Sequence, residues 1–136
     1  MTIQTADYAL GTANSEVKIS NNDGEIQVSY EDGWLDTRLP NGNLVRFSLY
    51  QRKHWTISYS WIYGERKYIY DGGMGRNDLL ALYVANNEMS FIEPSDQGAS
   101  TSYTVRFVPN TWKEDLLFRN YDRNAYHIEF ELVQVR

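Results

Sequence analysis

The segment Ala-Tyr-His-Ile-Glu-Phe-Glu-Leu-Val-Gln-Val, residues 125–135, alternates large apolar side chains with polar ones. The apolar members, which share one face of an extended chain, are Tyr126, Ile128, Phe130 and Leu132. The polar members on the other face are His127, Glu129 and Glu131. A two-residue period is typical of a β-strand with one face buried and the other in water. This segment therefore predicts a half-buried strand at the C-terminal end of the chain.

Three further stretches repeat this alternation, at residues 26–30, 54–62 and 103–107. In the second, Trp55, Ile57, Tyr59 and Trp61 are expected on one face, turned towards a core or a neighbouring subunit. Short strands at hairpin spacing favour an antiparallel sheet. We therefore predict a mainly β fold of roughly eight strands, an antiparallel β-sandwich or small β-barrel, in a single domain over residues 1–136.

One helix is predicted at about residues 77–86, with Asn77 as its N-cap, Asp78 in its first turn and an apolar face that begins at Leu79. Polar clusters predict turns at 21–24, 31–33, 40–43 and 51–53. The Asp23-Gly24 pair favours a hairpin between the strands on either side of it. Residues 112–118 fit a bent strand or a short helix equally well. Residues 1–13 predict an extended N-terminal arm.

Composition excludes several classes of protein. The net charge is −5 and basic runs are absent, which argues against a general nucleic-acid or anionic-membrane surface. The sequence has no apolar run near the roughly 20 residues that a membrane helix needs. It contains no cysteine, so disulfide bonds and thiolate chemistry are excluded. The first 13 residues lack the pattern of a signal peptide, and synthesis in a cytoplasm is expected.

The glycine-rich stretch Asp71, Gly72, Gly73, Met74, Gly75 and Arg76 precedes the predicted helix, where phosphate-binding loops occur. It lacks the Gly-Lys-Ser/Thr ending of such loops and the third spaced glycine of the dinucleotide pattern. A turn that lets the helix pack on the sheet explains it better. Because the stretch is polar, we also predict it as a subunit interface, together with the N-terminal arm.

No catalytic motif accompanies these elements, so no enzymatic activity, catalytic residue or cofactor is predicted. His127 with Glu129 could begin a zinc site, but solvated histidines are the simpler interpretation. Asn21, Asp23 and Glu25 have the first spacing of a calcium loop, although flanking helices are missing. No metal is therefore predicted.

The four tryptophans divide into two groups. Trp55 and Trp61 lie on the apolar face of a strand and are expected in a core or a subunit interface. Trp34 and Trp112 stand beside turns, where they could stack on a sugar. An alternative function is therefore a carbohydrate-binding β-sandwich module that uses these two side chains.

The order of elements from residue 44 onward resembles small tail proteins of tailed bacteriophages, particularly minor tail and distal-tail ring components. The shared layout has an aromatic strand, a short helix, a strand stopped by proline, and then alternating strands to the C-terminus. The segments that carry it are Arg46–Leu49, Trp55–Trp61, Tyr70–Gly73, Asp78–Tyr83, Phe91–Pro94, Tyr103–Phe107 and Tyr126–Val135.

This resemblance implies a β-barrel or sandwich with one helix, which self-assembles into, or docks on, a ring around the tail channel. Its partners would be other copies of itself and neighbouring tail proteins, with no specific nucleic acid, membrane or small-molecule substrate. Its location would be the tail of a virion, after synthesis in the host cytoplasm. The resemblance brings no catalytic residues with it.

Overall fold

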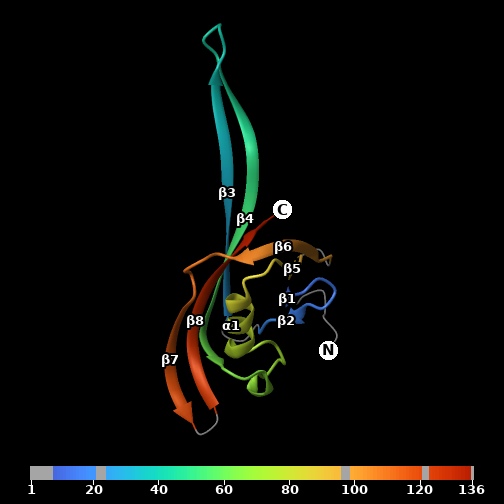
Figure 1. The fold of residues 1–136 in the computed structure, drawn as a ribbon, viewed down its shortest axis with the longest axis vertical. Coiled ribbons are helices and arrows are strands. Elements are labelled where there is room, and N and C mark those ends of the chain that lie inside the picture. Colours follow the sequence, from blue (N-terminus) through green and yellow to red (C-terminus); the bar gives the residue numbers. More distant parts are fainter. Residues whose placement is uncertain (1–7, 21–23, 96–98, 121–122, 136) are drawn as a thin grey trace.

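The computed structural model describes residues 8–20, 24–95, 99–120 and 123–135 (Figure 1). Their helical elements are a 3₁₀ turn at Arg66–Tyr68 and helix α1 at Arg76–Ala85. The strands are β1 (Ala9–Gly11), β2 (Val17–Lys18), β3 (Gly24–Arg38), β4 (Leu44–Tyr63), β5 (Met89–Glu93), β6 (Thr101–Phe107), β7 (Lys113–Asn120) and β8 (Arg123–Gln134). The chain is mainly β with one α-helix among these residues, as predicted.

The strands form a single eight-stranded sheet with the order β2-β1-β5-β6-β8-β4-β3, and β7 pairs with β8. All these pairings are antiparallel. β6 and β7 occupy successive halves of the same edge of β8, because Leu132 pairs with Phe107 whereas Glu129 pairs with Lys113. The sheet is not closed into a barrel. It curves around α1 instead (Figure 1).

The core lies inside this bend. The C-terminal strand contributes as its alternation predicts, since Ile128, Phe130 and Leu132 have no exposed surface. They meet Leu79 of α1 and buried residues of four other strands, β1, β4, β5 and β6, in one cluster. Burying a side chain of this size stabilises the fold by about 1.5–3 kcal/mol. This shared interior, more than any single hairpin, holds the sheet in its curved form.

A β-bulge in β4 changes which residues face the core. Tyr59 pairs with Ile128 and Ile62 pairs with Tyr126, so β4 has one residue more than β8 over this interval. An extra residue reverses the alternation. Ile62 is therefore buried, while Trp61 is only half-buried and packs beside Tyr63 at a centroid distance of 4.5 Å. The prediction that Trp61 shares the core face of Trp55 is wrong for this reason.

Two predicted turns lie inside continuous strands. Residues 31–33 belong to β3, and residues 51–53 belong to β4. Both segments lie where the hairpin leaves the core, and their exposed residues Glu31, Asp32, Gln51 and Arg52 are polar. The predicted turn at 40–43 is confirmed, with Gly42 at a φ of 89° and the Asn41 side chain accepting a hydrogen bond from the Asn43 N–H.

The N-terminal region pairs differently from the expectation. β2 pairs with β1, not with β3, and β2 and β3 begin and end the strand order, so the hairpin predicted at Asp23-Gly24 does not form. The predicted arm over residues 1–13 is wrong for its later part. Ala9–Gly11 forms β1, between β2 and β5, and Ala9 and Leu10 are completely buried. Residues 1–7 lie outside the described part of the chain.

The helix agrees closely with its prediction, apart from its start. Gly75 occupies the N-cap position that was assigned to Asn77, and its N–H donates to the Asp78 carboxylate. Asn86 ends the helix in the left-handed conformation, with a φ of 54°. Residues 112–118 fit a bent strand or a short helix by sequence, and residues 113–118 of them belong to strand β7, which continues to Asn120.

Candidate interaction surface

The outer half of the β3–β4 hairpin projects away from the rest of the protein (Figure 1). β4 pairs with β8 only from His54 to Tyr63, whereas β3 and β4 pair with each other out to Arg38 and Leu44. At about 3.3 Å per residue, the free part is about 30 Å long. It therefore carries surface that the core of this subunit does not use.

Several large apolar side chains are exposed on the projecting part of the hairpin. The large apolar side chains exposed on it by 40% or more are Tyr30, Trp34, Leu35, Leu39 and Leu44. They occupy both faces, because Trp34 and Leu35 are consecutive residues of one strand. Single exposed apolar residues are ordinary, but a concentration of them marks a site of interaction with another protein.

Polar contacts between its strands hold the hairpin together. The Arg46 guanidinium donates to both carboxylate oxygens of Asp36, at 2.8 and 3.2 Å, and lies 5.1 Å from the centre of the Trp34 ring. The hydrogen bond from Arg46 keeps the pKa of Asp36 below its usual range. The Gln51 amide donates to Asp32 at 2.9 Å. The acidic residues of this region thus have partners on the opposite strand.

A second exposed apolar surface lies on β7, at the opposite end of the molecule from the hairpin tip (Figure 1). Leu116, Leu117 and Phe118 are 52%, 47% and 41% exposed. Among the described strands, β7 pairs only with β8, so its other edge offers free backbone groups. Phe118 also lies 6.1 Å from Trp61, measured between ring centroids. An apolar edge strand is a template for pairing with another chain.

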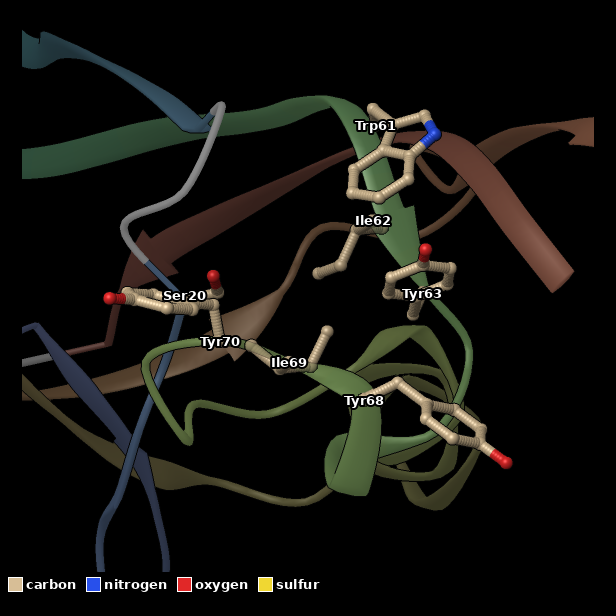
Figure 2. A pocket seen from close by; sticks show the side chains of 7 residues that line it. All are labelled: Ser20, Trp61, Ile62, Tyr63, Tyr68, Ile69 and Tyr70. Carbon is tan, nitrogen blue, oxygen red and sulfur yellow. The ribbon is translucent and has the colours of Figure 1, made fainter. Parts of the chain in front are cut away.

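A small cavity near this second surface is lined by Ser20 and by six aromatic and aliphatic side chains (Figure 2). Figure 2 shows Ile62 and Ile69 facing each other across it, while the hydroxyl of Tyr68 points away. Its volume is about 180 Å³. Because small-molecule sites usually measure about 300–1,000 Å³, this cavity is too small for most substrates.

The predicted interface loop Asp71–Arg76 is largely internal. Gly73, Met74 and Gly75 are buried, and the Met74 N–H donates to the Lys18 carbonyl at 2.9 Å. Asp71 accepts a hydrogen bond from the Gly73 N–H at 3.0 Å. The interface role of Asp71–Arg76 stays a prediction.

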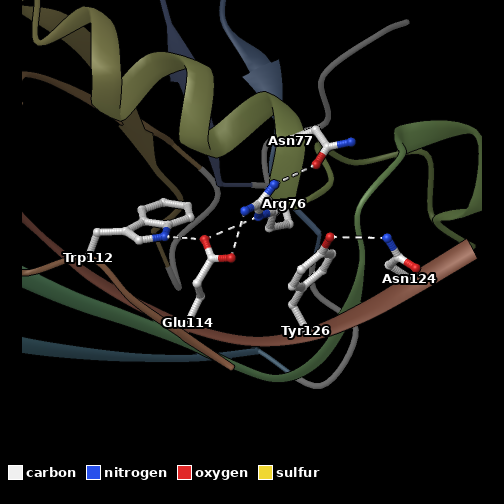
Figure 3. A network of polar contacts seen from close by, with 6 residues as sticks. All are labelled: Arg76, Asn77, Trp112, Glu114, Asn124 and Tyr126. Atoms are coloured by element: carbon white, nitrogen blue, oxygen red, sulfur yellow. Dashed lines mark hydrogen bonds and ion pairs between the residues drawn. The ribbon is translucent and has the colours of Figure 1, made fainter. Parts of the chain in front are cut away.

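Arg76, at the end of this loop, ties the helix to the sheet (Figure 3). Its guanidinium donates to both carboxylate oxygens of Glu114 on β7, at 3.2 and 2.6 Å, and lies 4.6 Å from the centre of the Tyr126 ring. The Trp112 indole N–H donates to the same carboxylate at 2.8 Å. Partial burial would raise the pKa of Glu114, but these hydrogen bonds keep it below its usual range.

The two candidate sugar-stacking tryptophans lie in different parts of the molecule. Trp34 is 53% exposed on the projecting hairpin. Trp112 is half-buried against the core, where its ring stacks on Phe130 with a centroid distance of 5.5 Å and an interplanar angle of 12°. No single binding groove contains both side chains.

The candidate metal ligands do not assemble within the described residues, where no group of three or more His, Cys, Asp or Glu side chains could hold an ion. His54 lies 3.6 Å from Glu31, and Glu129 faces Lys113 at 3.8 Å. Asn21 and Asp23, from the candidate calcium loop, lie outside the described residues. Nor does the described chain contain a helix that is long and apolar enough to cross a membrane.

Sequence reasoning missed most of the exposed apolar residues. The polar residues at 31–33 and 51–53 predicted turns within the hairpin, so Tyr30, Leu35, Leu39 and Leu44 were not recognised as one surface. The consecutive run Leu116-Leu117-Phe118 was a usable signal, because a half-buried strand should alternate.

No protein-family model matches this sequence, and no curated protein is significantly similar to it. Among solved structures, a chain in the tail of an empty gene transfer agent particle, determined with C6 symmetry, aligns with 97% of this chain and 92% of its own length. The TM-score is 0.54 at 12% sequence identity. A chain in the virion of a native gene transfer agent particle covers 99% of this chain and 95% of its own, with a TM-score of 0.45 at 10% identity. The first likeness shows a shared fold, and the second is too low to support an inference.

Proposed function

We propose that this protein is a non-enzymatic structural subunit of a phage tail, or of a tail derived from a prophage, and that it self-assembles into a ring around the tail channel. The observation that carries the proposal is the projecting β3–β4 hairpin, whose exposed apolar residues serve no core in their own subunit. A 136-residue chain has ample core without this extension. The hairpin is therefore best explained as a contact arm.

The position of the two apolar surfaces supports assembly from identical copies. The hairpin and the β7 edge lie at opposite ends of one subunit, so neither can cover the other within the same chain (Figure 1). When the two meet between copies, the contact is heterologous. Heterologous contacts generate rings if the rotation closes and filaments if it does not. Each contact would also cover an edge strand that is otherwise prone to aggregation.

The comparison supports the same class of function. The similar fold extends over nearly the whole chain and comes from a tail with C6 symmetry. The partners would then be other copies of this chain and neighbouring tail proteins, and the location would be the tail of a virion. A net charge of −5 is compatible with a channel that repels passing DNA.

The test is assembly of the purified full chain, followed by sedimentation velocity and negative-stain electron microscopy. The variant Trp34→Ser/Leu35→Ser removes apolar surface from the hairpin. The matched control Tyr70→Ser/Val84→Ser removes side chains that are 96% and 73% exposed elsewhere. We expect rings or tubes from the wild type and the control, and monomers from the hairpin variant. Wild-type protein that stays monomeric up to its solubility limit would overturn self-assembly. Equal assembly of the hairpin variant would overturn the role of the hairpin.

A further inference from the structure

A buried cation lies at the root of the projecting hairpin. β4 leaves β8 at the pair His54 and Val133, and Lys53 is the next residue towards the tip. Although it is a lysine, only 9% of its surface is exposed. Lysine is rarely buried to this extent unless its charge is paired. The position therefore has a specific structural requirement.

Lys53 joins the hairpin to the ends of two body strands. Its ammonium group pairs with the carboxylate of Glu93, the last residue of β5. The other oxygen of Glu93 accepts a hydrogen bond from the Trp55 indole N–H at 2.7 Å. The Lys53 backbone N–H donates to the side-chain oxygen of Gln134, at the end of β8, at 3.1 Å. Three contacts thus meet where the hairpin leaves the sheet.

Aromatic rings enclose the same ammonium group. Its nitrogen lies 5.1 Å from the ring centre of Tyr103, 5.5 Å from Trp55 and 5.8 Å from Tyr30. These residues belong to β6, β4 and β3, so the cation attracts rings from both the body and the hairpin. Burial alone would lower the pKa of Lys53, but the ion pair with Glu93 raises it above its usual range. Lys53 therefore remains charged at neutral pH.

We propose that Lys53 and Glu93 are positioning residues, which fix the direction in which the hairpin leaves the body and so the orientation of its apolar contact surface. The importance of this contact for assembly rests on the function proposed above. The role of the ion pair in fixing the direction of the hairpin does not depend on that function. A buried ion pair adds little net stability compared with apolar residues of similar volume, and a directional role explains its presence better.

The length of the hairpin makes its direction critical. A rotation of about 10° at the root would move the tip of an arm of about 30 Å by about 5 Å. A displacement of that size separates side chains that pack at about 4 Å. Loss of the ion pair should therefore weaken assembly even when the subunit remains folded.

The test uses the double variant Lys53→Met/Glu93→Gln, which removes the ion pair without leaving a buried unpaired charge. The matched control is Arg46→Met/Asp36→Asn, which removes an exposed ion pair within the hairpin itself. Because the chain has no cysteine, spin labels at Asn41→Cys on the tip and Asn87→Cys beyond α1 would be unique. Pulsed electron paramagnetic resonance then reports the distribution of tip-to-body distances in the monomer.

We expect the double variant to broaden this distribution and the control to leave it narrow. In unlabelled protein, the critical concentration for assembly should rise about tenfold in the double variant. If the double variant does not fold, Glu93→Gln alone tests the same contact. An unchanged distance distribution would overturn the positioning role. A broadened distribution in a protein that never assembles would preserve that role and overturn the proposed function instead.

Discussion

Replacing Gly73 with alanine tests whether the glycine-rich loop packs tightly against Ile19 and Ser20 or forms a loose turn. A Cβ atom at this position would lie 2.5 Å from the Ser20 nitrogen and 2.7 Å from both the Ile19 carbonyl carbon and the Ser20 Cα. All three are backbone atoms and cannot move away as a flexible side chain could. The isolated bridge between Ile19 and Met74 would have to open to make room.

The substitution should lower the free energy of unfolding by about 2–3 kcal/mol, which is in the upper part of the usual range for overpacking. A chain of 136 residues has an unfolding entropy of about 0.3 kcal/mol/K, from about 2.1 cal/mol/K per residue. The midpoint of thermal unfolding should therefore fall by about 7–10 °C. Calorimetry, or circular dichroism of dilute protein at several concentrations, measures this shift.

Gly42→Ala provides the matched control. Gly42 has a φ of 89°, and a Cβ atom there meets nothing within 4 Å. Its cost is therefore conformational only, about 1 kcal/mol, which corresponds to about 3 °C. If the Gly73→Ala variant is as stable as the Gly42→Ala variant, the loop does not pack tightly at Gly73.

Two further substitutions test other contacts. Glu114→Gln should cost about 1 kcal/mol at neutral pH, because hydrogen bonds to a charged group are lost at a partly exposed site. The folded-state pKa of Glu114 lies below its usual range, so its contribution is present above the unfolded pKa and disappears as the pH falls through the folded value. Urea titrations at neutral and acidic pH should then show that the free energy of unfolding falls less on acidification in the variant than in the wild type. An equal fall in both proteins would contradict this account. Trp112→Ala should cost about 2–3 kcal/mol, less than a fully buried tryptophan, whereas Trp34→Ala should cost under about 1 kcal/mol because Trp34 is 53% exposed. Comparable losses in denaturant titrations would show that Trp112 is not part of the core.

Alternation succeeded as a predictor wherever a strand has one face on the core. Ile128, Phe130 and Leu132 are buried as their spacing predicts, and Val105 and Phe107 agree with it. The helix was also predictable, since its residues are local in sequence. The turn at 40–43 was recognisable from Gly42, which adopts a conformation that other residues avoid.

The same rule failed where a strand leaves the core or changes register. Within these long strands Glu31, Asp32, Gln51 and Arg52 are polar and exposed because the hairpin leaves the core here. Trp61 changes face because one extra residue in β4 reverses the alternation, and nothing in its own neighbourhood marks that insertion. The exposed surface proposed for assembly was hidden from prediction for the first of these reasons.

The sequence by itself determined the class of fold, most of the core residues and the place of the helix, because these depend on side-chain period and on local backbone preference. Only the tertiary structure decided that β2 pairs with β1, that Gly73 packs against Ile19 and Ser20, and that the β3–β4 hairpin extends beyond the body. Each of these features depends on contacts between residues far apart along the chain, and local sequence patterns do not contain that information.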